Sequence, residues 1–493
     1  MERWVVVTSI LVLYLGVTLT IGLMAGRRAS KSVQGYVAGD RQFGLLVMYF
    51  VTGASVFSAF AFLGGPGWAY SQGAAAYYIL AYGVIGMGAW YWLGPRIAGV
   101  GRRHGFVTQA QLLMGRFPSR ALSLTLAVLA VLAFIPYVTL QMSGAAIVIQ
   151  AVTENHVPIW LGAALSYGVV VLYVLLGGVA AVGWTNTFQG IFMLAIAWTL
   201  GLYLPIHLYG GVGEMFNQIE AARPELLSLP GLTAAGQPWG WGGFSSAILV
   251  SAIGLMMWPH LFMKAFTAKD DRTLRRTVVL FPTFQLFLIP VFLIGFAGVL
   301  YPGSPPRPDF ILPYLILESN LSPIVVGLFC AGALSASMST GDALLHAAAS
   351  VAIEDGVHPF APGLSDKSQQ LWMKIVLIGV ALIAYGFAIS GSQSLVVLLL
   401  TAYGIICQFA PPILAALYWK RATTPGVLTG LISGSATALW FYFQGGRPFE
   451  LHEGLLGLMV HIPVLVAVSL MTQPQDPAHV ARFMGGGTEE APR

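Results

Sequence analysis

The stretch FVTGASVFSAFAFLGGPGWAYSQG, residues 50–73, is apolar and carries no charged side chain, yet residues that interrupt helices are concentrated in it. It is long enough to cross a bilayer, which takes about 20 apolar residues. Gly53-Ala54-Ser55 is followed by Gly64-Gly65-Pro66-Gly67. Proline removes a helical hydrogen bond and glycine lowers helix propensity. The stretch therefore predicts a broken membrane helix, although small residues also serve close helix packing.

The composition places this stretch in a membrane protein. Of 493 residues, 57% are hydrophobic and 9% are charged, whereas soluble chains carry about 25% charged residues. Mean hydropathy is +0.77. Cys330 and Cys407 lie in apolar runs, which excludes a disulfide framework and a zinc site. No basic patch alternates with aromatic residues, so we expect a lipid bilayer as a partner and no nucleic acid. Nothing in the sequence indicates the oligomeric state.

Uncharged stretches predict thirteen membrane helices in an all-α fold. These stretches are 4–26, 42–95, 121–153, 155–213, 226–263, 277–306, 319–353 (interrupted by Asp342), 375–419, 422–446 and 454–475. Residues 42–95, 155–213 and 375–419 are long enough for two helices each. Residues 4–26 are too long for a cleaved signal peptide, so we interpret them as a retained first helix. Residues 1–472 then form one transmembrane domain, and we expect the tail, 473–493, to be cytoplasmic and disordered.

The distribution of charge predicts the orientation. With thirteen crossings, twenty of the 24 Lys and Arg residues fall in one set of connections. The other set holds only Arg3, Arg223, Arg307 and Arg447. The positive-inside rule places the richer set in the cytoplasm. The N-terminus is therefore expected outside and the C-terminus inside.

A second interrupted helix suggests internal symmetry. The expected seventh helix, roughly 241–264, contains Gly254 and Pro259. It begins five helices after the first broken one, on the opposite side of the membrane. Such spacing is typical of an inverted five-helix repeat with a binding site at mid-membrane. The repeats would cover about 44–209 and about 241–419, which correspond to helices two to eleven.

Five motifs in order carry a family resemblance. They are residues 50–73 and ASMSTGDALL (336–345), with GGVAAVGWTNTFQG (177–190), WPHLFMKAFTAKD (258–270) and YWKRATTPGVLTG (418–430). Together they resemble the sodium:solute symporter family, which includes proline and pantothenate permeases and sodium/sugar cotransporters. The family implies thirteen helices, an outside N-terminus and an inverted-repeat core. RRHGFVTQAQLLMGRFPSRA (102–121) and FIPYVTLQMSGAAIVIQ (134–150) resemble its bacterial monocarboxylate permeases, for pyruvate, lactate and alanine-type solutes.

The resemblance implies a sodium site formed by two helices. Its ligands would be the Ala54 and Phe57 carbonyls, the Ala336 carbonyl, and the Ser339 and Thr340 hydroxyls. The residue types are consistent with such a site. Positions i, i+3 and i+4 share one helical face, and an unwound helix exposes carbonyl oxygens to a cation. On composition alone, such hydroxyls more often bond back to their own helix.

Three further residues are expected on the ion pathway. Family members commonly have an aspartate where this chain has Asn186, which keeps an oxygen ligand but no charge. Asp342 is the only acid within an expected span, and such a charge indicates function. His346 lies four residues later, within reach on the same face. A carboxylate beside an imidazole can relay protons, so H⁺ is the alternative to Na⁺ as the coupling ion. A pair at the helix end that reaches toward the cytoplasm is the simpler alternative.

The substrate site is expected between the two broken helices. No Lys or Arg is predicted at mid-membrane, so an anion would need neutral donors such as amide N–H groups at a half-helix end. The candidate side chains are Ser58, Phe60, Tyr137, Gln141 and Trp258, although membrane aromatics often serve packing. Val56, Phe60 and Ala61 lie where sugar transporters place polar groups. Lys264 matches a basic residue of the proline permease, and anchoring at the cytoplasmic surface is the alternative.

These features predict a sodium-coupled symporter that imports a small organic solute, most of all a short monocarboxylate, across a bacterial inner membrane. One alternative is proton-coupled or sodium-independent uptake of an amino acid such as proline, or of pantothenate. Another is a transporter-like sensor that acts with a separate partner. An enzyme is disfavoured, because no nucleophile–base pattern, metal spacing or phosphate loop occurs in the sequence.

Overall fold

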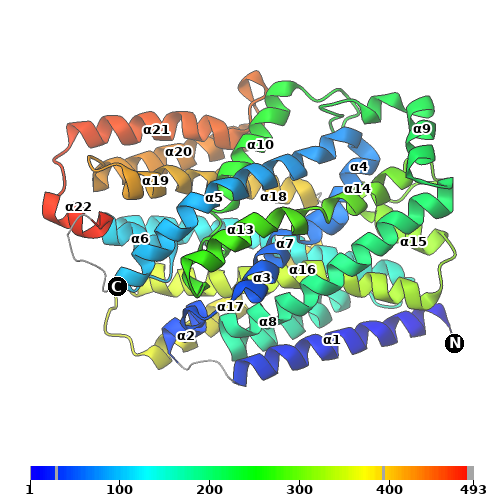
Figure 1. Ribbon diagram of the computed structural model, residues 1–493, viewed down its shortest axis with the longest axis horizontal. Coiled ribbons are helices and arrows are strands. Elements are labelled where there is room, and N and C mark those ends of the chain that lie inside the picture. Colours follow the sequence, from blue (N-terminus) through cyan, green and yellow to red (C-terminus); the bar gives the residue numbers. More distant parts are fainter. Residues whose placement is uncertain (1, 28–31, 391–394, 486–493) are drawn as a thin grey trace.

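The computed structural model describes residues 2–27, 32–390 and 395–485, which form one bundle of helices (Figure 1). The described residues contain no β-strand, and extended backbone pairs only between Phe43 and Ala268 and between Leu232 and Pro238. The predicted all-α class is confirmed.

The bundle is built from long helices joined by short ones. The first half comprises α1 Arg3–Arg27, α2 Val33–Ala38, α3 Leu45–Val56, α4 Gly65–Gln72, α5 Tyr77–His104, α6 Gln109–Arg116, α7 Arg120–Val152, α8 Ile159–Tyr209 and α9 Val212–Ala222. The second comprises α10 Trp241–Leu255, α11 Pro259–Phe262, α12 Lys264–Thr267, α13 Asp271–Gln285, α14 Leu288–Ala297, α15 Ile311–Glu318, α16 Pro323–Val351, α17 Asp366–Ser390, α18 Leu395–Ile406, α19 Ala410–Tyr418, α20 Thr424–Gln444, α21 Glu453–Met471 and α22 Pro477–Met484. Wider π-helical turns occur at Phe60–Gly64 and Ala352–Val357, and 3₁₀ turns at Gly39–Arg41, Gly73–Ala76, Pro224–Leu227, Pro308–Phe310, Cys407–Phe409 and Pro448–Glu450.

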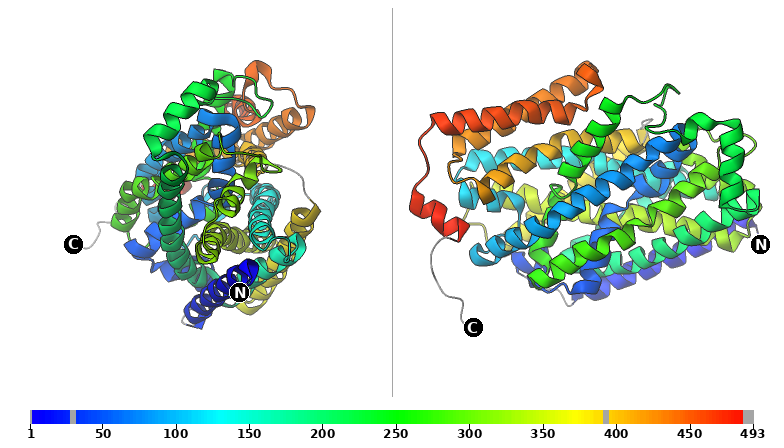
Figure 2. Two further views of the ribbon diagram at one scale, coloured as in Figure 1. Left: turned by 90° about the vertical axis from the view of Figure 1, so that its right-hand side faces the viewer. Right: turned by 45° about the horizontal axis from the view of Figure 1, so that its top comes forward.

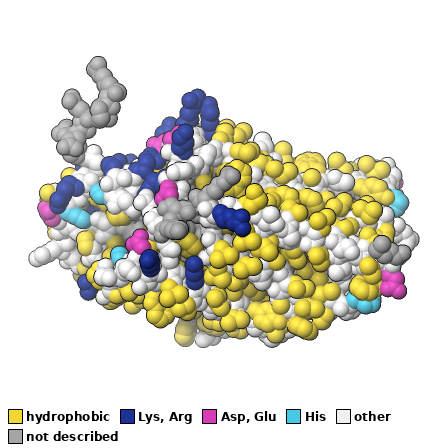
Figure 3. All heavy atoms as spheres, turned by 90° about the horizontal axis from the view of Figure 1, so that it is seen from below, with side chains coloured by type: hydrophobic (Ala, Val, Ile, Leu, Met, Phe, Trp, Pro, Cys, Tyr) yellow, Lys and Arg dark blue, Asp and Glu magenta, His cyan; other side chains and the backbone are white. Residues whose placement is uncertain are grey.

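The described helices are suited to a membrane. Eight of them are long and apolar enough to cross a bilayer, and two bent pairs raise the number to ten. Large apolar side chains are exposed on the outside of the bundle, among them Leu13, Trp92 and Leu382. Hydrophobic side chains cover the centre and right of the face in Figure 3, while most Lys and Arg side chains gather toward its left. The protein is therefore a multi-pass membrane protein.

Helices α7, α8 and α16 contact one another and form the centre of the bundle. Helix α16 is buried along most of its length, because its contact faces are made of Ala, Gly and Ser, which allow close approach of neighbouring helices. Seen end-on in Figure 2, α1 lies at one rim and the α20–α21 hairpin at the opposite rim. Helix α16, one of the two predicted sodium-binding helices, therefore lies in the interior.

Helix α8 is divided by a glycine with a special backbone conformation. Its 51 residues would extend about 77 Å at 1.5 Å per residue, more than twice the hydrocarbon thickness. Gly178 has φ 53° and ψ −144°, which breaks the helical path. A Cβ atom there would lie 2.6 Å from the Tyr36 ring and 2.7 Å from the Tyr36 carbonyl oxygen. The break therefore depends on glycine for both conformation and space.

We expect Gly178→Ala to lower the yield and melting temperature of the folded protein. The strained backbone alone costs about 1–3 kcal/mol, and the contact with Tyr36 adds to this. Gly168→Ala is the matched control in the same helix, because nothing lies within 4 Å of its added Cβ. Size-exclusion profiles and thermal unfolding of both variants check this, and equal stability of the two would contradict it.

Both predicted broken helices are broken. The chain bends by 55° between α3 and the helical segment beginning at Phe60, and by 47° between α10 and α11. The first break lies at Phe57 and Ser58, between the two glycine clusters rather than within Gly64-Gly65-Pro66-Gly67. Pro259 instead occupies the first turn of α11, where a missing N–H leaves no helical bond unmade. Pro66 directly follows the wider helical turn Phe60–Gly64, at the start of α4.

The expectation of a wholly disordered tail is wrong for residues 477–484, which form α22. Asp476 caps the helix by accepting a bond from the Ala478 amide at 3.0 Å. Val480 and Phe483 are buried, and His479 Nε2 lies 3.2 Å from the Arg116 carbonyl oxygen of α6. Two buried apolar side chains and one polar contact therefore hold α22 against the bundle. Residues 486–493 lie outside the described residues.

Candidate functional site

The break after α3 meets the middle of α7 and α16. Gln141 of α7 accepts a hydrogen bond from the Ala59 amide through Oε1 at 2.9 Å. Its backbone carbonyl accepts a bond from the Ser337 hydroxyl of α16 at 2.7 Å. Gln141 is fully buried. These two bonds fix the start of the second half-helix against both neighbours.

The predicted sodium ligands converge across this junction. The Ser339 hydroxyl donates to the Ala54 carbonyl at 2.9 Å, and the Thr340 hydroxyl donates to the same oxygen at 3.1 Å. Ser339 Oγ also lies 3.3 Å from the Ala336 carbonyl oxygen. These neutral oxygens are of the hard type that small cations prefer. Rotating both hydroxyl hydrogens away from Ala54 would free their lone pairs for such a cation.

Phe57 lies at the C-cap of α3, next to these ligands. Its ring stacks on Phe284 of α13, with centroids 5.6 Å apart and an interplanar angle of 6°. It also stacks on Phe281 at 5.7 Å. The aromatic stack positions the chain at the break, and the Phe57 carbonyl stays a predicted ligand.

Asn186 of α8 bonds to both helices of the predicted sodium site. Its Nδ2 atom donates to the Ser339 carbonyl at 2.8 Å and to the Ser55 hydroxyl at 3.3 Å. Its Oδ1 atom is buried and has no hydrogen-bond partner among the described residues. Asn186 thus lies beside the predicted ligands and offers them an unpaired oxygen.

Asp342 faces α8, which supplies two hydroxyl donors to its carboxylate. Its Oδ2 accepts bonds from the Tyr173 hydroxyl at 2.7 Å and the Thr185 hydroxyl at 3.1 Å. Oδ1 is buried without a partner in the described part of the chain. His346, expected within reach of Asp342, has a backbone partner: its Nε2 atom lies 2.9 Å from the Tyr36 carbonyl oxygen. His346 therefore interacts with the backbone of α2, although its spacing in sequence suggested Asp342 as its partner.

Lys264 is a basic residue inside the bundle, where the sequence predicted none. Its side chain is 4% exposed and interacts electrostatically with Asp342. Together with His260 and His346 it lines a small cavity between α2, α8, the α11–α12 segment and α16. A buried position of this kind argues against anchoring at the membrane surface as its main role.

The amide N–H groups expected to bind an anion at the first break already have partners. The Ala59 amide donates to Gln141, and the Phe60 amide donates to the Ser58 hydroxyl at 3.1 Å. The Ala61 amide donates to the Ser58 carbonyl at 2.9 Å. Ser58 therefore closes this helix end. A carboxylate would have to be bound by other donors.

Two buried side chains supply such donors. Trp258, at the second break, is 1% exposed and its Nε1 has no partner among the described residues. Gln141 Nε2 is equally unpaired. The Trp258 ring packs on Tyr137 with centroids 4.8 Å apart. Phe60 is also buried, so an aromatic surface with free N–H donors lies between the broken helices.

Sequence reasoning missed Tyr173, Thr185 and His260. The first two bond Asp342, and the third is buried next to Trp258, with ring centroids 5.8 Å apart. All three are polar residues within apolar stretches, and this feature of the sequence could have marked them as candidates. Nothing in their local sequence identifies their partners, however.

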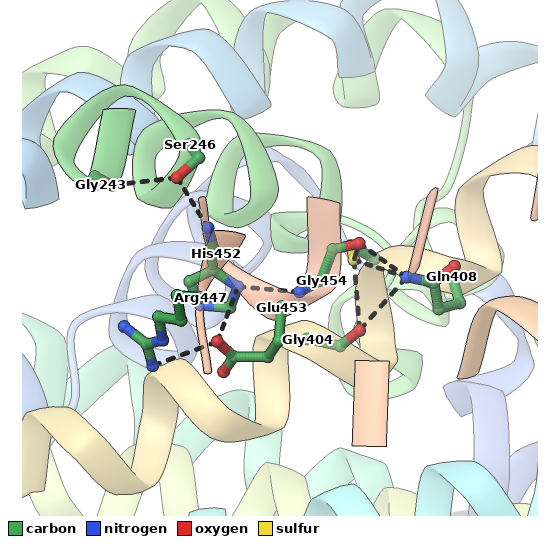
Figure 4. A network of polar contacts seen from close by, with 9 residues as sticks. Gly243, Ser246, Gly404, Gln408, Arg447, His452, Glu453 and Gly454 are labelled. Atoms are coloured by element: carbon green, nitrogen blue, oxygen red, sulfur yellow. Dashed lines mark hydrogen bonds and ion pairs between the residues drawn. The ribbon is translucent and has the colours of Figure 1, made fainter. Parts of the chain in front are cut away.

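A second polar network ties the outer hairpin to the first half of the broken pair (Figure 4). The His452 amide donates to the Ser246 hydroxyl of α10 at 2.9 Å. Gln408 Nε2 donates to the Gly454 carbonyl at 2.9 Å. The buried Glu453 carboxylate lies 3.1 Å from the Arg447 guanidinium. These bonds fix α21 to α10 and to the turn after α18.

Comparison with known proteins defines the class. The model of the sodium:solute symporter family matches residues 36–434, and the chain belongs to this family. An uncharacterised symporter, YhjB of Bacillus subtilis, is 30% identical over 94% of this chain and 97% of its own. The high-affinity proline transporter PutP of the same organism is 27% identical (94% and 98%). A monocarboxylate transport permease of Rhizobium johnstonii is 23% identical (95% and 97%).

A solved structure supports the fold. A Na⁺-coupled sialic acid symporter in an outward-open state superposes with a TM-score of 0.79 and covers 95% of this chain and 98% of that one, at 18% identity. The family and this structural neighbour are transporters rather than enzymes.

Proposed function

We propose that this protein is a secondary active transporter that couples inward sodium movement to import of a short monocarboxylate. The observation that carries the proposal is the convergence of the Ser339 and Thr340 hydroxyls on the Ala54 carbonyl at a helix break. A cation bound there would join α3 to α16. Ion binding would thereby favour one arrangement of the broken helix over another, which is the thermodynamic requirement for coupling.

The proposed topology has thirteen crossings, an outside N-terminus and an inside C-terminus. Two features support the number: α8 is long enough for two crossings and breaks at Gly178, and Ala402–Tyr418, which comprises the end of α18 and all of α19, is a short apolar helix. Helices two to eleven would form two inverted repeats, about 44–209 and 241–419, whose first members are the broken helices. Alternating access would then occur by movement of one repeat against the other. The bacterial relatives support a location in a bacterial inner membrane.

The chemistry of the site supports a small carboxylate. Trp258 Nε1 and Gln141 Nε2 are buried donors without acceptors in the described residues, and unpaired buried donors favour a ligand that accepts hydrogen bonds. Tyr137 and Phe60 offer apolar surface but few polar groups, which favours a short carbon chain over a polyhydroxylated sugar. Proline and pantothenate also carry a carboxylate, so the same donors would serve those alternatives.

We expect pyruvate and lactate to compete with labelled substrate for uptake, and glucose and galactose to have no effect. Proteoliposomes with an inward sodium gradient provide the assay, with a panel of unlabelled solutes in large excess. Proline and pantothenate belong in the panel because they distinguish the substrate alternatives. Strong competition by a sugar, with none by any monocarboxylate, would contradict the proposed substrate class.

A further inference from the structure

His260 is a buried side chain that neither the sodium site nor the predicted substrate site includes. It follows Pro259 at the start of α11 and is 2% exposed. Neither ring nitrogen makes a hydrogen bond of normal geometry to a described residue. The backbone of Ser55 approaches one ring nitrogen closely enough for a weak hydrogen bond.

This position is unfavourable for a histidine that only fills space. A neutral imidazole carries one N–H donor and one acceptor nitrogen. The weak bond to the Ser55 backbone satisfies at most one of them, and burying the other unpaired carries a desolvation cost that a phenylalanine of similar shape would avoid. Buried polar groups in native proteins are paired in the great majority of cases. A ligand that binds beside His260 would supply the missing hydrogen-bond partner.

The surroundings of His260 define what that partner can be. Its ring lies 5.8 Å from Trp258 and 5.9 Å from Tyr137, measured between centroids. Gln141 follows Tyr137 by four residues on α7, so it lies on the same face of that helix. The unpaired donors of Trp258 and Gln141 therefore border the same region as the imidazole. Lys264 lines a small cavity with His260, and the Asp342 carboxylate offsets its charge.

We infer that His260 is a substrate ligand whose ring N–H donates to the carboxylate of a short monocarboxylate. The inference rests on the proposed function and names a recognition residue within it. The donors and the aromatic walls are complementary to a small anion with an apolar end. Because a neutral imidazole has one N–H, the bond to the carboxylate would select the tautomer that presents it to the substrate and would replace the weak interaction with the Ser55 backbone.

The test compares a carboxylate with its neutral amide. Binding of L-lactate, pyruvate and lactamide is measured calorimetrically in sodium buffer, on the purified full chain and on His260→Phe and His260→Gln. His260→Phe keeps the ring contacts but removes both nitrogens, whereas His260→Gln keeps an N–H donor. His461→Phe is the matched control, because His461 is a buried histidine of α21 bonded to Gln408, in another part of the bundle.

We expect His260→Phe to weaken lactate binding by roughly tenfold to a hundredfold, as for loss of a hydrogen bond to a charged group. Lactamide binding should change much less, and His260→Gln should recover part of the loss. His461→Phe should bind lactate as the original chain does. Sodium binding without substrate should persist in His260→Phe, which separates a lost ligand from a misfolded protein.

The remaining outcomes separate the two levels of the proposal. If the original chain binds neither lactate nor pyruvate, the proposed substrate class fails and the role of His260 fails with it. If it binds them and His260→Phe binds them equally well, the substrate class stands and the inference about His260 is overturned. Equal loss of lactate and lactamide binding, with a lower melting temperature, would show a structural role and also overturn it.

Discussion

Ser339→Ala and Thr340→Ala are each expected to raise the sodium concentration needed for half-maximal uptake by about tenfold or more. Each hydroxyl is one oxygen ligand, and a polar interaction with a charged group contributes about 1.5–3 kcal/mol, where about 1.4 kcal/mol corresponds to tenfold. Both side chains are buried and both contact the Ala54 carbonyl of α3. Losing either one therefore removes a ligand from the junction of the two helices.

Ser350→Ala is the matched control for these variants. Ser350 is also a buried serine of α16, but its hydroxyl donates to the His346 carbonyl within its own helix at 2.8 Å. Its removal should leave the sodium dependence unchanged. Initial uptake rates are measured against sodium concentration at equal protein abundance. An unchanged sodium dependence in both Ser339→Ala and Thr340→Ala would remove these residues from the ion site.

Asp342→Asn is expected to lower the apparent sodium affinity by roughly tenfold, since a nearby charge in a protein interior contributes on the order of 1–2 kcal/mol. Asp342 is fully buried, and its partner Thr185 directly precedes Asn186, which bonds the Ser339 carbonyl. The carboxylate would thus compensate for the charge that Asn186 lacks. Sodium titrations of uptake measure the effect.

Asn186→Asp in the Asp342→Asn background should restore part of the affinity, because it returns a negative charge to the neighbouring position on α8. Asn186→Asp alone should not reproduce the loss. A proton-coupled protein would behave differently: its uptake would rise as external pH falls, would survive replacement of sodium, and would lose this pH dependence in Asp342→Asn. That pattern would replace sodium by protons as the coupling ion.

The sequence predicted the features that arise from local chemistry. Gly and Pro lower helix stability wherever they occur, so the two breaks could be located to within a few residues. The spacing of Ser339 and Thr340 on one face follows from helix geometry alone. The charge-free stretches likewise indicated a membrane protein. Each of these properties depends on residues adjacent in the chain.

The partners of Asp342 could not be predicted in the same way. Tyr173 and Thr185 lie 169 and 157 positions away in sequence, so their contact depends on how α8 packs on α16. The same packing brings the Tyr36 carbonyl to His346. The sequence spacing of Asp342 and His346 gave no indication of this partner. Lys264 was expected near a helix end, and the short α11–α12 segment carries it into the interior instead.

The most direct test of the coupling mechanism is uptake driven by one ion gradient at a time. Proteoliposomes are loaded so that either an inward sodium gradient or an inward proton gradient is present, and accumulation of labelled lactate and pyruvate is followed. We predict transient accumulation above equilibrium with the sodium gradient alone, and none with the proton gradient in sodium-free medium. Accumulation driven by the proton gradient alone, with no response to sodium, would contradict the account.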